Sequence, residues 1–278
     1  MSEFEKALDF TTESLRKLKD TGSVLRGSRE SLRRLGSTRT KSAPSPVAAA
    51  TAAPDAAPPA TQPSMDVFPT TGGTKQERIE QLRAAVQVCE KCPHLVRSRT
   101  QTVFGVGNID ARIMFVGEAP GADEDLQGEP FVGKAGQLLT KIIETMGVKR
   151  FDVFIANVLK CRPHMPPGST GNRRPTAAEM QTCLPYLRAQ IEAIKPAVLV
   201  ALGAVAMEGL LGNVEPMARL RGRWHEFHGI PLMATYHPAY LLRNQSLSEK
   251  RKVWEDMLLV MERVGLPISE KHRGYFSR

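Results

Sequence analysis

The chain has 278 residues, of which 41% are hydrophobic and 24% charged, and its formal net charge at pH 7 is +9. A chain of this length can bury one substantial core, and its positive balance suits a polyanionic partner such as nucleic acid. Because no stretch approaches the roughly 18 apolar residues of a membrane span and the charged N-terminus lacks the apolar centre of a signal peptide, we expect no membrane association and a cytoplasmic, nucleoid-associated location.

The N-terminal part differs in composition from the rest. Residues 1–41 are basic and carry apolar side chains near helical spacing, which predicts a partly helical tail. This tail is either simply solvated or tethers a replication or repair partner. Residues 42–75 are rich in Ala and Pro and hold too few large apolar side chains to offset the entropy of ordering, so they are predicted to be a linker. We therefore expect a disordered N-terminal extension followed by one domain over residues 76–278.

Strand and helix patterns alternate along that domain. Apolar runs predict four buried strands over residues 113–116, 153–158, 197–202 and 231–236. Helical patterns cover residues 74–89, 135–146, 176–194, 204–210 and 247–264. This order predicts the α/β class, as a three-layer α/β/α sandwich with a central four-stranded parallel sheet. Ligands collect at the carboxyl ends of parallel strands. Glu118 and His237 follow the first and fourth of these strands and Asn157 lies at the end of the second, so we expect the three residues to share one site.

The segment after the first strand has the composition of a ligand loop. It reads GEAPGADEDLQGEPFVGKAGQLL from Gly117, and its glycines let the backbone approach a ligand closely. Glu118 and Glu124 place carboxylates beside that surface. We therefore expect this segment to carry catalytic or ligand-binding residues.

Four cysteines form a second group of candidate functional residues. Cys89 and Cys92 make a CxxC pair before the first strand, Cys161 follows the second strand, and Cys183 lies in the next helix. Two close and two distant thiols can enclose zinc or an iron–sulfur cluster, and the spacing does not separate these options. Four unrelated buried cysteines are the alternative. Four protein thiolates would leave no open position for substrate, so a metal here is expected to be architectural.

Three motifs in order resemble one known family. The GEAPGADEDLQGEPFVGKAGQLL segment, NVLKCRP from Asn157 and HPAYLLR from His237 resemble the family 4 uracil-DNA glycosylases, the iron–sulfur branch of that superfamily. The resemblance covers roughly residues 76–264. It implies a uracil-DNA glycosylase-like fold, a [4Fe–4S] cluster on the four cysteines, and hydrolysis of the bond between uracil and deoxyribose in single- or double-stranded DNA, which starts base excision repair. The loop between Cys161 and Cys183 is longer than is usual in the family.

The resemblance also implies how the pocket reads uracil. Phe131 matches the aromatic residue that stacks on the flipped base, although a Phe in an apolar loop is more often core. Asn157 matches the amide that reads N3–H and O4, although Asn is also common where a strand ends. Glu124 matches the second acid of the family and is expected near C5 of uracil, where it would help exclude the methyl group of thymine.

Cleavage of the bond between uracil and deoxyribose leaves positive charge on the sugar and negative charge on the base, and both charges need to be stabilised. Glu118 matches the group that positions water or stabilises the sugar cation, and His237 matches the donor to O2 of the departing base. Backbone N–H groups around Ala119 are expected to bind the uracil carbonyls.

The HPAYLLR segment is expected to contact DNA. Tyr240, Leu241 and Leu242 are placed to wedge into the base stack, and Arg243 to contact a phosphate. The alternative is that both leucines face the core. Arg162, Arg173 and Arg174 could add phosphate contacts from the longer loop.

Two other functions compete with this hypothesis. One is a related iron–sulfur glycosylase that becomes trapped covalently on uracil-containing DNA, but VGKAGQ lacks the KRRIH insertion of that branch. The other is a non-catalytic, metal-stapled nucleic-acid-binding module, which would not need Glu118, Phe131, Asn157 and His237 together. We expect a monomeric uracil-DNA glycosylase.

Overall fold

The structure is a computed structural model that describes residues 73–163, 165, 171–212 and 215–277. The chain divides into two units, Met1–Thr61 and Gln62–Arg278, and all described residues belong to the second. The predicted tail over residues 1–41 and nearly all of the predicted linker over residues 42–75 lie outside the described residues.

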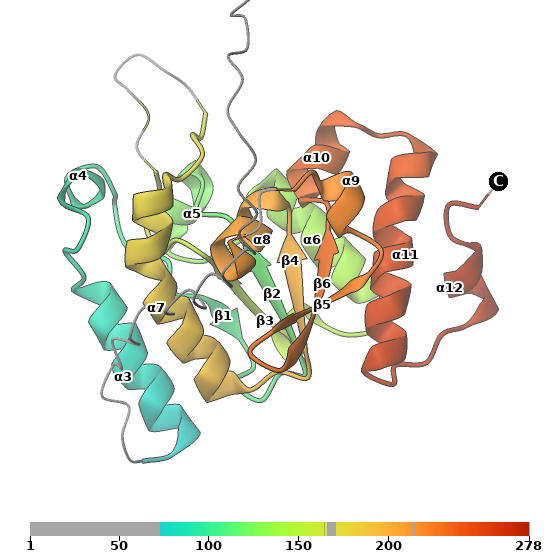
Figure 1. The fold of residues 1–278 in the computed structure, drawn as a ribbon, viewed down its shortest axis with the longest axis horizontal. Coiled ribbons are helices and arrows are strands. Elements are labelled where there is room, and N and C mark those ends of the chain that lie inside the picture. The colour runs from blue at the N-terminus through green and yellow to red at the C-terminus, as the bar shows by residue number, and fades with distance from the viewer. Residues whose placement is uncertain (1–72, 164, 166–170, 213–214, 278) are drawn as a thin grey trace, which may run out of the picture. The chain divides into compact units, whose positions relative to one another are not determined.

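A six-stranded mixed sheet forms the centre of the domain, with strand order β1-β3-β2-β4-β6-β5 (Figure 1). Its four inner strands are parallel and match the four predicted strands. They are β3 (Phe154–Asn157), β2 (Ile113–Gly117), β4 (Val198–Leu202) and β6 (Ile230–Thr235). All residues of β2, β3 and β4 are buried, as expected of strands covered on both faces.

Both edges of the sheet are antiparallel, so the prediction of a purely parallel, four-stranded sheet was wrong there. The edge strands are β1 (Val106–Gly107), which pairs with β3, and β5 (Trp224–Phe227), which pairs with β6. β1 is too short to show a pattern, and β5 reads WHEF without an apolar run. A turn with positive φ at His228 (48°) and Gly229 (78°) joins β5 to β6, which is the geometry that hairpins favour.

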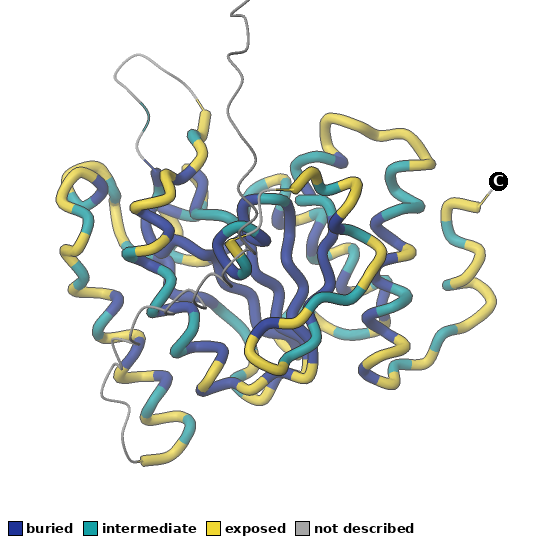
Figure 2. The backbone as a smooth tube through the Cα atoms, in the orientation of Figure 1, coloured by how far each residue is buried: buried dark blue, intermediate teal, exposed yellow. Residues whose placement is uncertain are grey.

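Helices cover both faces of the sheet. On one face, α3 (Lys75–Gln87), α7 (Ala177–Ile194) and α8 (Ala204–Leu211) share a core with alternate strand residues, including Met114 and Val116. On the other face, α6 (Lys134–Thr145) and α11 (Leu247–Arg263) pack on the opposite set, including Ile113 and Phe115. The buried residues run through the middle of the domain, as Figure 2 shows. The three layers and these five helices agree with the prediction.

Several short helices were not predicted, because none exceeds 6 residues and so none shows a full period of apolar side chains. They are α4 (Pro93–Val96), α5 (Ala122–Gln127), η1 (Arg150–Asp152), α9 (Met217–Leu220), α10 (Pro238–Arg243) and α12 (Glu270–Gly274). Over the described residues, no helix combines the length and the apolar character that crossing a bilayer would need.

Candidate active site and cysteine site

The carboxyl ends of the parallel strands bring the predicted pocket residues together. The register of β2 and β3 places Gly117 beside Asn157. A Cβ at Gly117 would lie 2.4 Å from Oδ1 of Asn157 and 2.5 Å from Cζ of Phe131. The amide and the ring therefore meet over the bare Cα of Gly117, and a residue with a side chain would separate them.

Asn157 holds an unpaired polar atom at this point. The residue is only 2% exposed, and its Oδ1 is buried with no hydrogen-bond partner in the described structure. Leaving a buried polar atom unpaired costs roughly 1–3 kcal/mol, so such atoms in native proteins call for an explanation. A ligand that donates a hydrogen bond to this oxygen would remove the cost.

Phe131 sits on a strained loop that three contacts hold. Its φ is 57°, an uncommon conformation for a residue with a side chain. Arg150 donates from Nη2 to the carbonyl oxygen of Pro130 at 2.7 Å. Gly136 packs so closely that a Cβ there would lie 1.7 Å from the carbonyl oxygen of Phe131. The third contact is made by Glu124.

Glu124 binds backbone N–H groups on both sides of the loop. Its Oε1 accepts from Val132 N at 3.0 Å and from Gly133 N at 3.1 Å, and its Oε2 accepts from Gly121 N at 3.0 Å. The carboxylate therefore ties the start of α5 to the segment that carries Phe131. This geometry gives Glu124 a positioning role, which differs from the predicted contact near C5 of uracil.

His237 is presented as a neutral donor. Its Nδ1 accepts a hydrogen bond from Ala239 N at 3.1 Å, which caps α10 and assigns the ring hydrogen of the neutral form to Nε2. Burial, helped by the nearby Arg243 cation, lowers the pKa of His237 to about 4. The ring centroids of His237 and Phe131 lie 5.5 Å apart. A neutral imidazole with Nε2–H available thus stands beside the predicted stacking residue.

Glu118 and Ala119 follow β2 directly and are both half-buried. Burial raises the pKa of Glu118, and the positive charge of Arg174 opposes that rise. Arg174 also forms an ion pair with Glu208 on α8. The carboxyl group of Glu118 is thus held at the pocket end of β2 in a partly desolvated position.

The HPAYLLR segment forms α10, with His237 as its N-cap. Some of the residues predicted to contact DNA are exposed on this helix and others are buried. Tyr240 stacks on Tyr236 with ring centroids 4.5 Å apart. Leu241 is 5% exposed and belongs to the core, whereas Leu242 is 39% exposed. Arg243 is also exposed. Of the two leucines, only Leu242 is placed to enter a base stack without leaving the core.

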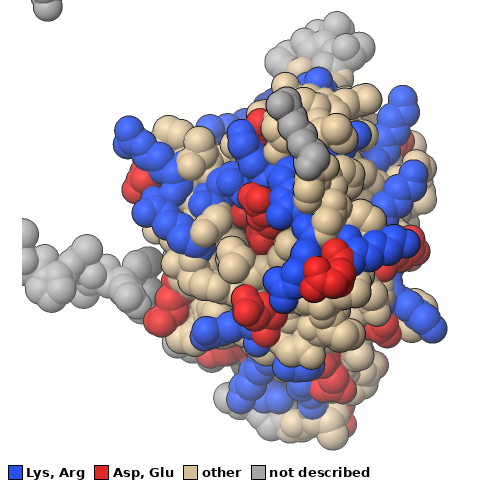
Figure 3. Space-filling model, turned by 90° about the vertical axis from the view of Figure 1, so that its right-hand side faces the viewer, with Lys and Arg blue, Asp and Glu red and all other residues tan. Residues whose placement is uncertain are grey.

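The neighbouring surface is not uniformly basic. Figure 3 shows the face on the side of α11 and α12, where blue Lys and Arg side chains lie among red Asp and Glu side chains. On α11, Arg251 pairs with Glu255 at 2.9 Å and Lys252 pairs with Glu249 at 2.7 Å. These cations are partly neutralised by their own helix, so this face gives no separate argument for DNA binding.

All four cysteines line one cavity, together with Glu179 and Tyr186. Lys160 N donates to Sγ of Cys183 at 3.2 Å, and Nη1 of Arg99 donates to Sγ of Cys161 at 3.0 Å. Burial raises the pKa of Cys161 and raises that of Cys183 to about 12, so these thiols keep their protons unless a cation binds them.

The four cysteines line the cavity but are not arranged as a ready site for a single metal ion. Within residues 73–163, 165, 171–212 and 215–277, no group of three or more His, Cys, Asp or Glu side chains could hold a metal ion as the side chains stand. The structure therefore brings the predicted ligands together from three distant segments but does not arrange them around a single ion.

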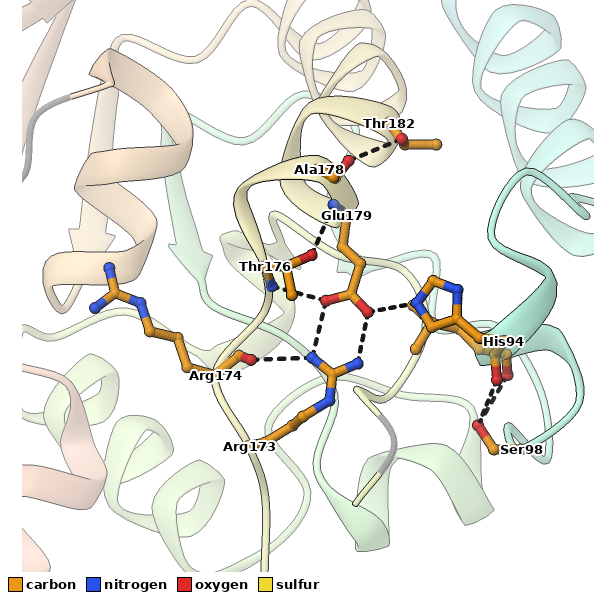
Figure 4. A network of polar contacts seen from close by, with 9 residues as sticks. His94, Ser98, Arg173, Arg174, Thr176, Ala178, Glu179 and Thr182 are labelled. Carbon is orange, nitrogen blue, oxygen red and sulfur yellow. Dashed lines mark hydrogen bonds and ion pairs between the residues drawn. The ribbon is translucent and has the colours of Figure 1, made fainter. Parts of the chain in front are cut away.

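A polar network ties the segment that follows Cys92 to α7, which carries Cys183, and to the loop that precedes α7 (Figure 4). Glu179 on α7 accepts from Nη1 and Nη2 of Arg173 at 2.9 and 2.5 Å and contacts Nε2 of His94 at 2.7 Å. His94 lies two residues after Cys92, and Arg173 belongs to the loop between Cys161 and Cys183. The guanidinium of Arg173 is the main reason that the pKa of Glu179 falls to about 2. Arg173 therefore serves the cysteine site, and the sequence indicated only a possible phosphate contact.

Arg150 and Lys160 were missed as site residues. Arg150 lies on η1, and nothing in the sequence links it to Pro130. Lys160 carried one signal, because a lysine between Leu159 and Cys161 interrupts an apolar stretch.

Comparison with known proteins agrees with this geometry. The model of the uracil DNA glycosylase superfamily matches residues 104–258. The chain is 45% identical to a type-4 uracil-DNA glycosylase of Thermotoga maritima over 187 residues, which cover 66% of this chain and 93% of that relative. It is 42% identical to the type-4 enzyme of Archaeoglobus fulgidus over 182 residues, which cover 63% of this chain and 88% of that relative. A type-5 uracil-DNA glycosylase of Pyrobaculum aerophilum is 31% identical over 185 residues, which cover 55% of this chain and 79% of that relative.

This chain belongs to the uracil-DNA glycosylase superfamily, in its type-4 group. The family predicted from the three motifs is thereby confirmed.

Proposed function

We propose that this protein excises uracil from DNA by hydrolysing the bond between the base and deoxyribose, which starts base excision repair. The observation that carries this proposal is the buried, unpaired Oδ1 of Asn157 beside the ring of Phe131. A pyrimidine extruded from the duplex would supply the missing donor and the stacking partner at the same time.

Asn157 would distinguish uracil from cytosine. Its Oδ1 accepts from N3–H of uracil and its Nδ2 donates to O4. Cytosine presents a lone pair at N3 and an amino group at C4, so both contacts would face the wrong partner. Each buried group left unpaired in this way costs roughly 1–3 kcal/mol.

Phe131 and His237 would hold and release the base. Stacking on the Phe131 ring is worth roughly 1–3 kcal/mol. As the glycosidic bond breaks, negative charge gathers on uracil, and the Nε2–H of His237 donates to O2 where that charge develops. A neutral donor suffices for this role. Backbone N–H groups around Ala119 would bind a second uracil carbonyl.

Glu118 would act on the sugar side. As the base departs, C1′ of deoxyribose becomes positive, and a carboxylate nearby stabilises that charge and orients the attacking water. Water adds its oxygen to C1′, uracil leaves with the bonding electrons, and a proton returns to the base. The partly desolvated position of Glu118 strengthens its interaction with the developing cation.

Glu124 would act through the loop that carries Phe131. Its three hydrogen bonds to backbone N–H groups support a role in holding the stacking loop. Exclusion of the thymine methyl group by Glu124 stays a prediction from the family resemblance.

DNA would lie across α10. Leu242 is the exposed apolar side chain that can fill the gap left by the flipped base, Arg243 is exposed for a phosphate, and Tyr240 supports both through its stack on Tyr236. Leu241 would support α10 from the core.

The cysteines would hold a [4Fe–4S] cluster that staples three segments together. A donor set of four sulfurs suits zinc or iron–sulfur chemistry. A single zinc ion needs all four sulfurs at about 2.3 Å from one point, whereas in a four-iron cluster each thiolate binds its own iron. All four cysteines line one cavity, which is the donor set that a four-iron cluster requires, and the type-4 relatives support the choice of the cluster over zinc. Cys89, Cys92, Cys161 and Cys183 would be the ligands.

One experiment tests the activity. The protein is incubated with a labelled oligonucleotide that carries one uracil, and alkali is then added to cleave any abasic site. We expect a strand break at the uracil, and none at thymine or cytosine in the same position. An intact strand after prolonged incubation would defeat the proposal, and a stable covalent adduct would favour the trapped-enzyme alternative.

A second experiment tests the metal. We expect about four iron and four sulfide per chain and broad visible absorbance. A colourless protein with stoichiometric zinc would reverse the assignment. The monomeric state, the nucleoid-associated cytoplasmic location and a partner for the tail stay predictions from the sequence.

A further inference from the structure

Lys160 lies between the two sites and is 1% exposed. The chain passes from Asn157 at the end of β3 to Cys161 in the cysteine cavity within a few residues, and Lys160 is buried on the way. Phe131 of the pocket packs in the core of one sheet face, whereas Cys161 and Cys183 pack in the core of the other. Residues 157–161 therefore connect two sites that belong to different layers.

Hydrogen bonds from Lys160 reach both sites. Its Nζ donates to the carbonyl oxygen of Asn157 at 3.0 Å, and its backbone N–H donates to Sγ of Cys183 at 3.2 Å. Nζ also donates to Oε1 of Gln190 at 2.5 Å, and Nε2 of Gln190 donates to the carbonyl oxygen of Phe104 at 2.9 Å. Lys160 is thus bonded to the end of β3 and to α7, and Gln190 connects it further to Phe104.

The charge of Lys160 lacks an acidic partner. Among the ion pairs found over the described residues, none includes Lys160. Burying an ammonium group is unfavourable unless an opposite charge is near. The nearest group that could carry a compensating charge is Cys183, whose Sγ accepts a hydrogen bond from the backbone N–H of Lys160 and which becomes negative only when its thiol loses its proton to a bound metal group. A thiolate-ligated metal group would carry the negative charge that this buried cation needs.

We propose that Lys160 is a positioning residue that couples the cysteine site to the base-reading amide, with its charge balancing the thiolates and its ammonium group fixing the backbone of Asn157. This inference rests on the proposed function. It would give the cysteine site, which is expected to be architectural, an effect on the position of Asn157.

The test compares full-length Lys160→Met with the wild-type protein. Methionine keeps most of the length of lysine and removes the charge and the donors. We expect the visible absorbance of the bound metal group to disappear about 10-fold faster when a chelator is added. We also expect KM for a uracil oligonucleotide to rise about 10-fold. Changes of about 10-fold are typical when a residue that contacts a metal ligand is replaced. Lys141→Met, at an exposed position on α6, is the matched control and should change neither quantity.

A second variant separates this coupling from general damage to the pocket. Asn157→Ala keeps the backbone carbonyl that Lys160 contacts, so it should lose excision and keep the wild-type lifetime of the metal group. A folded Lys160→Met protein in which either the lifetime or KM stays at the wild-type value would overturn the inference.

A measurement on the native protein decides the question if Lys160→Met does not fold. Coupling between two sites is reciprocal, so occupation of the pocket must protect the metal group. An oligonucleotide with 2′-fluorodeoxyuridine, which resists hydrolysis, should lengthen the lifetime of the absorbance at least about twofold relative to one with 2′-fluorothymidine. Equal lifetimes would overturn the coupling. Wild-type protein that fails to release uracil would instead defeat the proposed function.

Discussion

Replacing Asn157 with aspartate removes one donor from the pocket and leaves the shape of the side chain almost unchanged. Oδ1 of Asn157 is buried and unpaired, and the residue is 2% exposed, so water cannot compensate for a wrong partner. In Asn157→Asp, one carboxylate oxygen can still accept from N3–H of uracil, but the other faces O4 without a hydrogen to donate.

The expected magnitude follows from the buried hydrogen bond. Losing one such bond costs about 1–3 kcal/mol, which lowers the rate of uracil excision by about 5- to 150-fold. For cytosine the change has the opposite sign, because the new oxygen accepts from the amino group. The preference for uracil over cytosine should therefore fall by about 30-fold or more.

The assay is single-turnover excision from two oligonucleotides that differ only in carrying uracil or cytosine. Asn108→Asp, at an exposed loop position, is the matched control and should leave both rates unchanged. If Asn157→Asp keeps the wild-type preference, even with a lower rate, Asn157 does not read the base and the argument from its unpaired oxygen fails.

Three further predictions concern pH, the wedge and the stacking loop. The pKa of His237 is about 4 in the folded protein against 6.5 for the free side chain, so the unfolded chain binds more protons between these values and stability falls as the pH drops from about 6.5 to about 4. His237→Asn should weaken this pH dependence of the melting temperature. Leu241→Ala should lower the free energy of unfolding by about 2–5 kcal/mol, whereas Leu242→Ala should keep stability and slow excision from duplex more than from single strands. Arg150→Met should raise KM for uracil DNA in the wild type and have no effect when Phe131 is already Ala, because it acts through that ring.

Each of these three predictions has an outcome that would contradict it. His228→Asn at an exposed turn is the control for His237→Asn, and equal changes in the two would show that the buried imidazole is not responsible. Duplex and single-strand rates that fall together in Leu242→Ala would remove the wedge role. Additive effects of the Arg150 and Phe131 changes would show that Arg150 does not act through Phe131.

The sequence by itself determined the inner sheet and the composition of the pocket. Strands buried on both faces must be continuous apolar runs, and the four such runs correspond to β2, β3, β4 and β6. Because parallel strands end at one edge, the positions of Glu118, Asn157 and His237 at or just after the ends of those runs were enough to predict that they meet. The motifs and the four cysteines were enough to predict the family.

Only the tertiary structure decided how each of these groups is presented. Edge pairing of β1 and β5 depends on neighbours distant in sequence, and a six-residue helix such as α10 shows no period that could separate buried Leu241 from exposed Leu242. The unpaired oxygen of Asn157, the Nε2–H form of His237 and the buried position of Lys160 are set by contacts across the fold. The hydrogen bonds and the burial of a side chain depend on which atoms surround it. Many of those atoms belong to residues far away in the sequence, and only folding brings them together.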